Sequence, residues 1–215
     1  MKYYAVKVGK APGIYENWQE CREQINHYSG AVFKSFEDRA AAEAFLLSDD
    51  KPAINEALPL AYIDGSYSKN NSLYSWGGYI YAGGKYHILQ GTGNNPEYLP
   101  DRNIAGEAIG ALQVLHTAQR LDIAEINLYY DYAGLEQWPL DKWRATTALS
   151  KYYKDYAQLM SSFIKVNYIK VAGHSGIYGN EIADLLAKEA AGAHLRKKDI
   201  AALETFRIEA AAMAY

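Results

Sequence analysis

Four acidic residues stand where a carboxylate is costly unless it does chemistry. Asp64 ends the apolar run Leu60–Ile63 within YIDGSY, and Asp131 ends the run LYYD. Strands disfavour Asp, and a carboxylate near a dry core needs something to compensate its charge. Glu107 and Asp184 stand in two predicted helices, each on or beside an otherwise apolar stripe. The question is therefore what these four acids bind.

Acids that converge form a site for divalent cations. Carboxylates that lie close together repel one another unless cations lie between them. Hard oxygen ligands favour Mg²⁺ or Mn²⁺, and two such ions roughly 4 Å apart are the arrangement of two-metal phosphodiesterases. Residues 58–192 carry 11 Lys and Arg against 13 Asp and Glu, a net charge of −2. Two divalent ions would change this to +2, so the site could accept a polyanion.

Each acid also has an explanation without chemistry. Glu107 could be a solvated helical residue, and Asp131 could simply begin the loop DYAGL. Asp184 could pair with Lys188, four residues further along its helix. These explanations weaken together if all four acids meet at one edge of a sheet.

The order of the predicted elements brings the acids to one edge. Periodicity and turn residues predict, in order, strands at 60–66, 73–83 and 85–91, a helix at 100–121 capped by Asp101, a strand at 123–130, a helix at 141–162, a strand at 163–173 and a helix at 180–192. A right-handed crossover would lay strand 123–130 parallel to strand 60–66. Ligands of open α/β sheets bind where neighbouring strands end together. We therefore predict an α/β domain with a five-stranded mixed sheet and flanking helices.

Residues 1–46 predict a small α/β module of their own. Its elements are strands at 3–9, 14–15 and 31–36 and helices at 17–28, capped by Asn17, and 37–46. Residues 47–57 carry charges, a proline and few large apolar groups, which indicates a linker. Residues 193–215 look helical and amphipathic, with no role beyond packing on the body or on a partner.

Composition is that of an ordinary soluble globular protein, with 49% hydrophobic and 22% charged residues. No run of about 18 apolar residues predicts a membrane span, so we expect no membrane partner. The start, MKYYAVKVGK, lacks the apolar core of a secretory signal. The single cysteine, Cys21, is expected to be buried in a helix and fits a reducing cytosol, which predicts a cytoplasmic protein. A net charge of −3 gives no hint of a nucleic-acid partner.

A histidine adds to the acids. His174 lies in the loop AGHSGIYGNE, ten residues before Asp184. A histidine in a loop is often only solvated, but one flanked by glycines beside a metal-site helix is expected to be functional.

At this point the residues resemble a known family. YIDGSY, AGEAIGAL, LYYDYAGLEQW, KVAGHSG and NEIADLLAKEA, in this order, make residues 58–192 similar to the type 1 ribonuclease H family. YYAVKVGKAPGIYENWQEC and GAVFKSF make residues 1–46 similar to the hybrid-binding domain that is also seen in caulimovirus viroplasmin proteins. The resemblance implies a ribonuclease H-like fold preceded by a small hybrid-binding module.

The resemblance also implies a reaction, which is hydrolysis of the RNA strand of an RNA–DNA hybrid, leaving 5′-phosphate and 3′-hydroxyl ends. Two Mg²⁺ ions, for which Mn²⁺ substitutes, would be held with Asp64 bridging both. Asp184 would complete the ion that activates water, while Glu107 and Asp131 would hold the ion facing the leaving oxygen. His174 would assist turnover or product release.

Substrate contacts follow from the same resemblance. Asn103 matches a position that contacts RNA 2′-hydroxyls in the minor groove. The N-terminal residues that match nucleic-acid contacts are Tyr4, Trp18, Phe33 and Lys34. Two departures weaken the expected grip, because Ile104 and Ser35 replace polar and basic residues common in the family. Apart from the resemblance, the favoured role of Trp18 and Phe33 is packing in the core of so small a domain.

Two other functions stay open at this point. A non-catalytic scaffold could bind hybrids or double-stranded RNA through residues 1–46, although a pure binder gains nothing from clustered acids. Another two-metal enzyme, such as an exonuclease or an integrase-like transferase, could use the same sheet. The histidine loop and the N-terminal module favour the hybrid nuclease.

Overall fold

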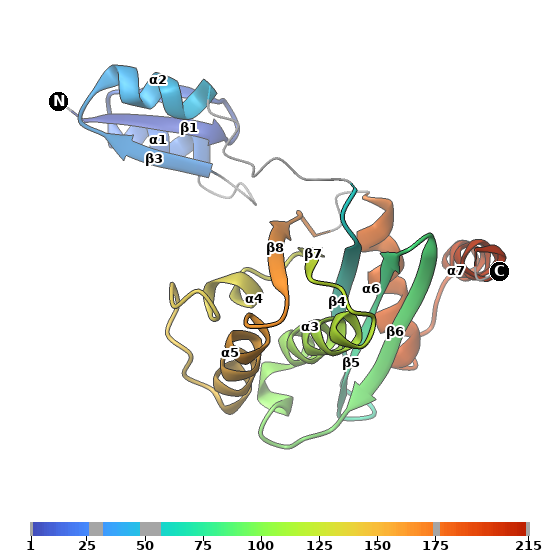
Figure 1. Ribbon diagram of the computed structural model, residues 1–215. Helices are drawn as coiled ribbons and strands as arrows, with labels where there is room; N and C mark the ends of the chain where they lie inside the picture. Colours follow the sequence, from blue (N-terminus) through green and yellow to red (C-terminus); the bar gives the residue numbers. More distant parts are fainter. Residues whose placement is uncertain (1, 26–31, 48–56, 174–176, 214–215) are drawn as a thin grey trace. The chain divides into compact units, whose positions relative to one another are not determined.

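The computed structural model describes residues 2–25, 32–47, 57–173 and 177–213. The chain divides into two compact units, Met1–Asn55 and Glu56–Tyr215 (Figure 1). Each unit has its own sheet.

The first unit is a three-stranded antiparallel sheet with two helices. Strand β1 (Tyr3–Val8) lies between β2 (Gly13–Tyr15) and β3 (Val32–Phe36), and helices α1 (Trp18–Ile25) and α2 (Arg39–Leu47) pack on it. The Gln19 N–H donates to Oδ1 of Asn17 over 2.8 Å, which confirms the expected cap. The end predicted for this helix, residues 26–28, lies outside the described residues. Among the residues whose burial is described, the buried apolar ones in this unit are small, namely Ala5, Val6, Cys21 and Ala42.

The second unit is built on a mixed sheet in the order β6-β5-β4-β7-β8. Its strands are β4 (Leu60–Ser68), β5 (Leu73–Ala82), β6 (Lys85–Gly93), β7 (Glu125–Tyr130) and β8 (Lys165–Lys170). Strands β4, β5 and β6 form an antiparallel meander, whereas β7 lies parallel to both β4 and β8. The predicted five-stranded mixed sheet and its parallel crossover are confirmed.

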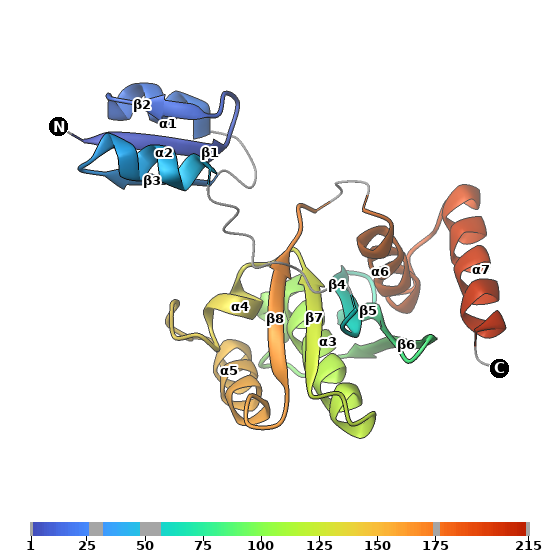
Figure 2. The same ribbon diagram turned by 45° about the horizontal axis from the view of Figure 1, so that its top comes forward.

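Helices cover both faces of this sheet (Figures 1 and 2). One face carries the larger apolar core, formed with α3 (Asn103–Arg120), the short α4 (Gly134–Gln137) and α5 (Ala148–Met160). The other face carries a smaller apolar cluster, formed with α6 (Tyr178–Ala190) and α7 (Lys197–Ala212). No helix among the described residues has the length and apolar character that crossing a membrane requires.

Two local expectations are wrong. Asp101 lies in a 3₁₀ turn (Leu99–Asp101), and the residue before α3 is Arg102, with φ +52° and no side-chain cap. The helix expected over 141–162 begins only at Ala148. Asp141 has φ +57°, which interrupts a helix, and the Thr147 hydroxyl accepts the Ser150 N–H over 3.1 Å to start the helix there.

Helix α3 lies very close to the sheet because two glycines permit it. A Cβ on Gly106 would stand 1.9 Å from the backbone oxygen of Ser75 in β5. A Cβ on Gly65 would stand 2.4 Å from the backbone nitrogen of Glu107. The absence of both side chains brings α3, and with it Glu107, against the strand that carries Asp64.

This close approach predicts an asymmetry between two glycines of α3. In Gly106→Ala the new methyl meets rigid backbone, so we expect a loss of about 3 kcal/mol of unfolding free energy. In Gly110→Ala it meets side-chain atoms instead, at 2.6 Å from Cδ1 of Ile63 and 2.8 Å from Cβ of Trp76. That second change should cost less, since side-chain atoms can shift further than a backbone oxygen of the sheet and Ala favours helix. Urea unfolding followed by circular dichroism measures both, and equal losses would contradict this account.

Candidate active site

Three of the predicted acids converge at one edge of the sheet. Asp64, Glu107 and Asp131 each offer a carboxylate oxygen, and these oxygens lie within 4.8 Å of one another. Strands β4 and β7 pair with Tyr62 beside Tyr129, so the same register, continued by two residues, sets Asp64 beside Asp131. Glu107 reaches them from α3. The sheet register and the close helix therefore build the cluster.

Glu107 is the most deeply enclosed of the three. Its side chain is buried, and Oε2 has no hydrogen-bond partner. Burial, followed by the charges of Asp131 and Asp64, raises the pKa of the Glu107 carboxyl well above its usual value. A buried carboxylate oxygen without a partner calls for an explanation in a native structure, and a cation is one.

The ionised form of Asp64 is disfavoured for the same reasons. Burial, then the charges of Asp131 and Asp184, raise the pKa of its carboxyl to about 8. The Gly65 N–H donates to Oδ1 of Asp64 over 2.7 Å and opposes this rise. This hydrogen bond alone does not restore the usual pKa of Asp64. A nearby cation would therefore be needed to ionise the Asp64 and Glu107 carboxyls at neutral pH.

The donor set fits a hard divalent cation. Carboxylate oxygens are the ligands that Mg²⁺ and Mn²⁺ prefer, and a cation would satisfy the orphaned Oε2 while offsetting the repulsion. The acidic cluster is thus able to bind metal.

Asp184 lies on α6, outside the three-acid cluster but within its electrostatic reach. Its charge helps to raise the pKa of Asp64. Its Oδ2 also accepts a hydrogen bond of 2.6 Å from the Lys188 ammonium. The lysine pairing and the approach to the site, which the sequence posed as alternatives, therefore occur together.

The remaining predicted site residues of this unit are only partly placed. His174 lies outside the described residues. Its neighbour Gly173 is close to the cluster, because a Cβ there would stand 2.8 Å from Oδ2 of Asp131. Asn103 is the exposed first residue of α3, and its backbone oxygen would lie 2.2 Å from a Cβ on Gly65. The start of α3 thus runs beside the strand of Asp64.

One polar residue near the site was not predicted. Asn180 lies one helical turn before Asp184, is 3% exposed and leaves Oδ1 without a hydrogen-bond partner. The signal available in the sequence was its spacing of four residues from Asp184, which places both on one side of α6.

Aromatic side chains form a contiguous exposed surface on the first unit. The Trp18 ring centroid lies 5.3 Å from that of Tyr4 and 5.9 Å from that of Phe33. Trp18 and Phe33 are 45% and 42% exposed, so they do not form the core of this unit. The neighbouring Lys34 is exposed, with its ammonium 5.5 Å from the Phe36 ring centroid.

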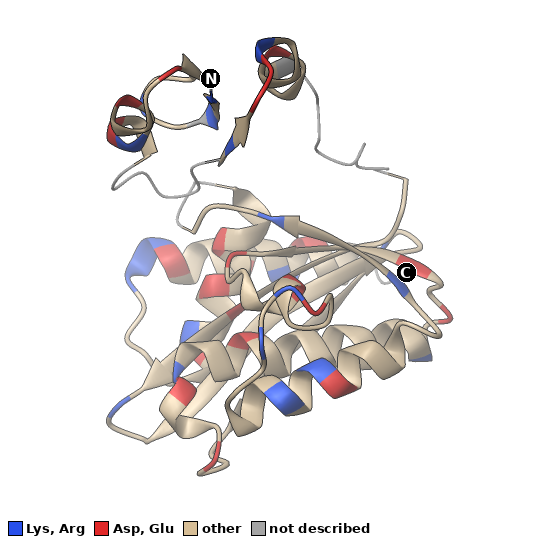
Figure 3. Ribbon diagram, turned by 90° about the vertical axis from the view of Figure 1, so that its left-hand side faces the viewer, with Lys and Arg blue, Asp and Glu red and all other residues tan. Residues whose placement is uncertain are grey.

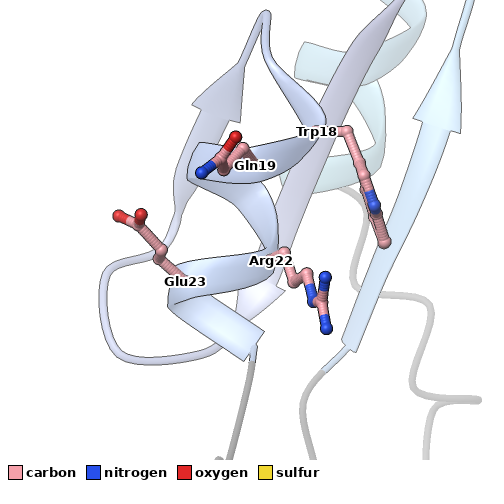
Figure 4. Close-up of a pocket in the computed structure, with 4 residues that line it drawn as sticks. All are labelled: Trp18, Gln19, Arg22 and Glu23. Atoms are coloured by element: carbon pink, nitrogen blue, oxygen red, sulfur yellow. The ribbon is translucent and has the colours of Figure 1, made fainter.

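Arg22 extends this aromatic surface. An open cavity of about 380 Å³ is lined by Trp18, Gln19, Arg22 and Glu23. Figure 4 shows the side chains of Trp18 and Arg22 projecting from the same side of α1, while Glu23 points away. Sequence reasoning missed Arg22, although its spacing of four residues from Trp18 on a helix was available.

Comparisons with known proteins match both units. The family model described as "RNase H" matches residues 57–192, and that described as "Ribonuclease H1 N-terminal domain" matches residues 2–46. The chain is 24% identical to "Ribonuclease H1" of Mus musculus, in an alignment that covers 88% of this chain and 89% of that protein. It is also 24% identical to "Ribonuclease H1" of Homo sapiens, with the same coverage.

A solved structure supports the fold. The N-terminal RNase H domain of a Mycobacterium tuberculosis protein, solved as a fusion with maltose-binding protein, aligns with a TM-score of 0.50 at 17% identity. The alignment covers 62% of this chain and 96% of that one.

The raised carboxyl pKa values predict how stability depends on pH without divalent cations. Below pH about 4 the Asp64 carboxyl is protonated in both states and costs nothing. Between pH about 4 and about 8 the unfolded chain has lost this proton while the folded chain keeps it. The free energy of unfolding should therefore fall as pH rises, by roughly 1.4 kcal/mol per pH unit for this group.

Urea titrations across this pH range test the slope. Asp64→Asn should make it shallower by the contribution of this one group, whereas Asp155→Asn, which removes the same charge from an exposed position, should leave it intact. If Asp64→Asn leaves the wild-type slope unchanged, the pKa of Asp64 is not raised in the folded protein.

Proposed function

Because the chain belongs to the ribonuclease H family, we propose that it hydrolyses the RNA strand of RNA–DNA hybrids with divalent ions held by its acidic cluster. It is a ribonuclease H hydrolase. The observation that carries the proposal is the convergence of Asp64, Glu107 and Asp131, whose carboxylate oxygens lie within 4.8 Å. A scaffold that only bound hybrids would bear this repulsion without benefit.

The four acids divide the work of holding the ions. Two Mg²⁺ ions, for which Mn²⁺ substitutes, would stabilise the charge that develops on the phosphate and lower the pKa of the attacking water. Asp64, central in the cluster, would be shared by both. Glu107 and Asp131 would hold one ion, and Asp184, across from them on α6, would complete the other. The products would carry 5′-phosphate and 3′-hydroxyl ends.

Residues around the cluster would select and release the substrate. Asn103, exposed at the start of α3, would contact RNA 2′-hydroxyls in the wide minor groove. Its neighbour Ile104 packs against the apolar core and offers no polar contact. His174, the residue after Gly173, would assist product release.

The first unit would bind the duplex through its aromatic surface. Tyr4, Trp18 and Phe33 present ring faces, while Lys34 and Arg22 supply positive charges for phosphates. Residues 1–46 carry six Lys and Arg and six Asp and Glu, so binding by this unit would be weak and strongly salt-dependent. Double-stranded RNA, which presents the same phosphates, would be a weaker ligand of this unit.

A cleavage assay tests the proposed reaction. With Mg²⁺ or Mn²⁺ the protein should cut RNA in a hybrid while sparing single-stranded RNA, duplex RNA and duplex DNA. Asp64→Asn should reduce the rate about a thousand-fold or more, because a metal site supplies several kcal/mol of transition-state stabilisation. The same variant should still bind the hybrid, and Asp155→Asn should cleave like the wild type.

The competing functions give different outcomes in that assay. A scaffold would leave the hybrid intact with either metal and would be insensitive to Asp64→Asn. A two-metal exonuclease or transferase would act on DNA duplexes instead. Either result would overturn the proposal.

The aromatic surface predicts a second, separable defect. Measured in an Asp64→Asn background, Trp18→Ala should weaken hybrid binding about 5- to 100-fold, the effect of losing about 1 to 3 kcal/mol of stacking. Arg22→Ala should reduce the slope of log affinity against log salt concentration by about one, because one phosphate contact is lost.

A charge-matched control is available within the same unit. Arg39 already pairs with Glu43 over 3.1 Å, so Arg39→Ala should leave the salt dependence unchanged. If Arg22→Ala and Arg39→Ala behave alike, Arg22 makes no phosphate contact.

A further inference from the structure

Helix α7 lies beyond residues 57–192, which match the ribonuclease H family model, yet it belongs to the second compact unit. It packs against α6 and β6 (Figure 2). Its buried side chains are Leu203, Phe206 and Ala210. The family match does not explain why the chain adds this helix to the catalytic domain.

An apolar anchor joins α7 to the sheet. Phe206 is fully buried, with its ring centroid 5.0 Å from that of Tyr79 and 5.2 Å from that of Tyr86. Tyr79 in turn packs on Tyr62, with centroids 5.6 Å apart, and Tyr62 lies two residues before Asp64 in β4. Helix α7 thus packs on the sheet layer that carries the active-site edge.

A polar fork joins α7 to α6. Arg207 donates from Nη1 to Oε1 of Glu189 over 3.0 Å and from Nη2 to Oε2 over 2.6 Å. This Arg207 fork, then burial in the opposite direction, then Gln90, set the pKa of the Glu189 carboxyl, which is lowered overall. Because this ion pair is partly exposed, it adds little to the free energy of unfolding. Its two parallel hydrogen bonds do, however, define one orientation of α6 against α7.

The Arg207 fork contacts the C-terminal half of α6, which hydrogen bonds also hold against the sheet. Gln90 in β6 donates both to Oε2 of Glu189 and to the Leu186 oxygen, each over 2.8 Å. The Ser75 hydroxyl donates to the Ala187 oxygen over 2.7 Å. At the other end, α6 begins at Tyr178, and its N-cap residue Ile177 makes no side-chain capping hydrogen bond. Asp184 stands between the uncapped start and the tied end.

We propose that α7 is a clamp that positions Asp184, with Arg207 and Phe206 as its positioning residues. The fork holds the end of α6 that follows Asp184, and the Phe206 anchor holds α7 on the β5–β6 layer. Together they fix the distance at which the Asp184 carboxylate faces Asp64. The inference rests on the proposed function only in taking Asp184 as a metal ligand.

Metal binding by the full-length protein, without substrate, tests the clamp. Isothermal titration calorimetry with Mn²⁺ should show that Arg207→Ala binds the ion about tenfold more weakly, as is typical when a metal ligand loses its outer support. Arg207→Lys, which keeps the charge but loses the fork, should recover part of the affinity. Circular dichroism spectra and melting curves accompany each variant to confirm that it folds.

A matched control lies on the same helix. Arg196 also makes a two-point contact, with Asp199 over 2.7 and 3.1 Å, but within the start of α7. Arg196→Ala should therefore leave Mn²⁺ affinity unchanged. An equal loss in Arg196→Ala and Arg207→Ala would mean that α7 only stabilises the fold, and the clamp would be wrong.

A double-mutant cycle separates positioning of Asp184 from general loosening. In an Asp184→Asn background, Arg207→Ala should cause no further loss of Mn²⁺ affinity, because the ligand that it positions is already gone. Additive losses would overturn the proposal, and so would wild-type affinity in Arg207→Ala. Since these measurements use no nucleic acid, a failure to cleave hybrids would count against the proposed function alone.

Discussion

The repulsion among three neighbouring carboxylates is the interaction on which the rest of this structure depends. Asp64, Glu107 and Asp131 are held with oxygens within 4.8 Å, although burial and neighbouring negative charge oppose the ionisation of Asp64 and Glu107. The fold imposes this arrangement through the parallel pairing of β4 and β7 and through the side-chain-free surfaces of Gly65 and Gly106. Elements that do no chemistry hold the acids where cations are needed.

How much of the site the sequence predicts depends on how local its cause is. The position of Asp131 follows from a strand end and a right-handed crossover, which are properties of short segments and chain order. Asp64 was expected at a strand end too, but β4 continues to Ser68, so Asp64 lies within the strand and only its place beside Asp131 was predicted. Glu107 depends on the close approach of α3, which involves a backbone oxygen of β5 that no pattern within α3 reveals. The setting of Asp184 depends on α6, whose supports come from Gln90 and Arg207, each remote in sequence.

The errors have the same physical origin. The helix expected over 141–162 starts at Ala148, because backbone conformation at Asp141 and the Thr147 cap outweigh helical periodicity. Packing alone favoured Trp18 and Phe33 as core residues of a very small domain, whereas the family resemblance implied nucleic-acid contacts, and both side chains are exposed. The size and hydrophobicity of a side chain indicate how much apolar surface it could bury. They do not reveal which aromatic side chains stay exposed.

Charge explains how this protein can act on a polyanion. Basic and acidic residues are interspersed over the second unit (Figure 3), and residues 1–46 are balanced. Long-range attraction would therefore contribute little, and binding would rest on ring faces in the first unit and on ions held by the second. Because two divalent ions would change the net charge of residues 58–192 from −2 to +2, bound metal would strengthen the binding of hybrid. By linkage, bound hybrid strengthens the binding of metal equally. Because the acidic cluster would hold these ions, catalysis and substrate recognition would depend on the same ions.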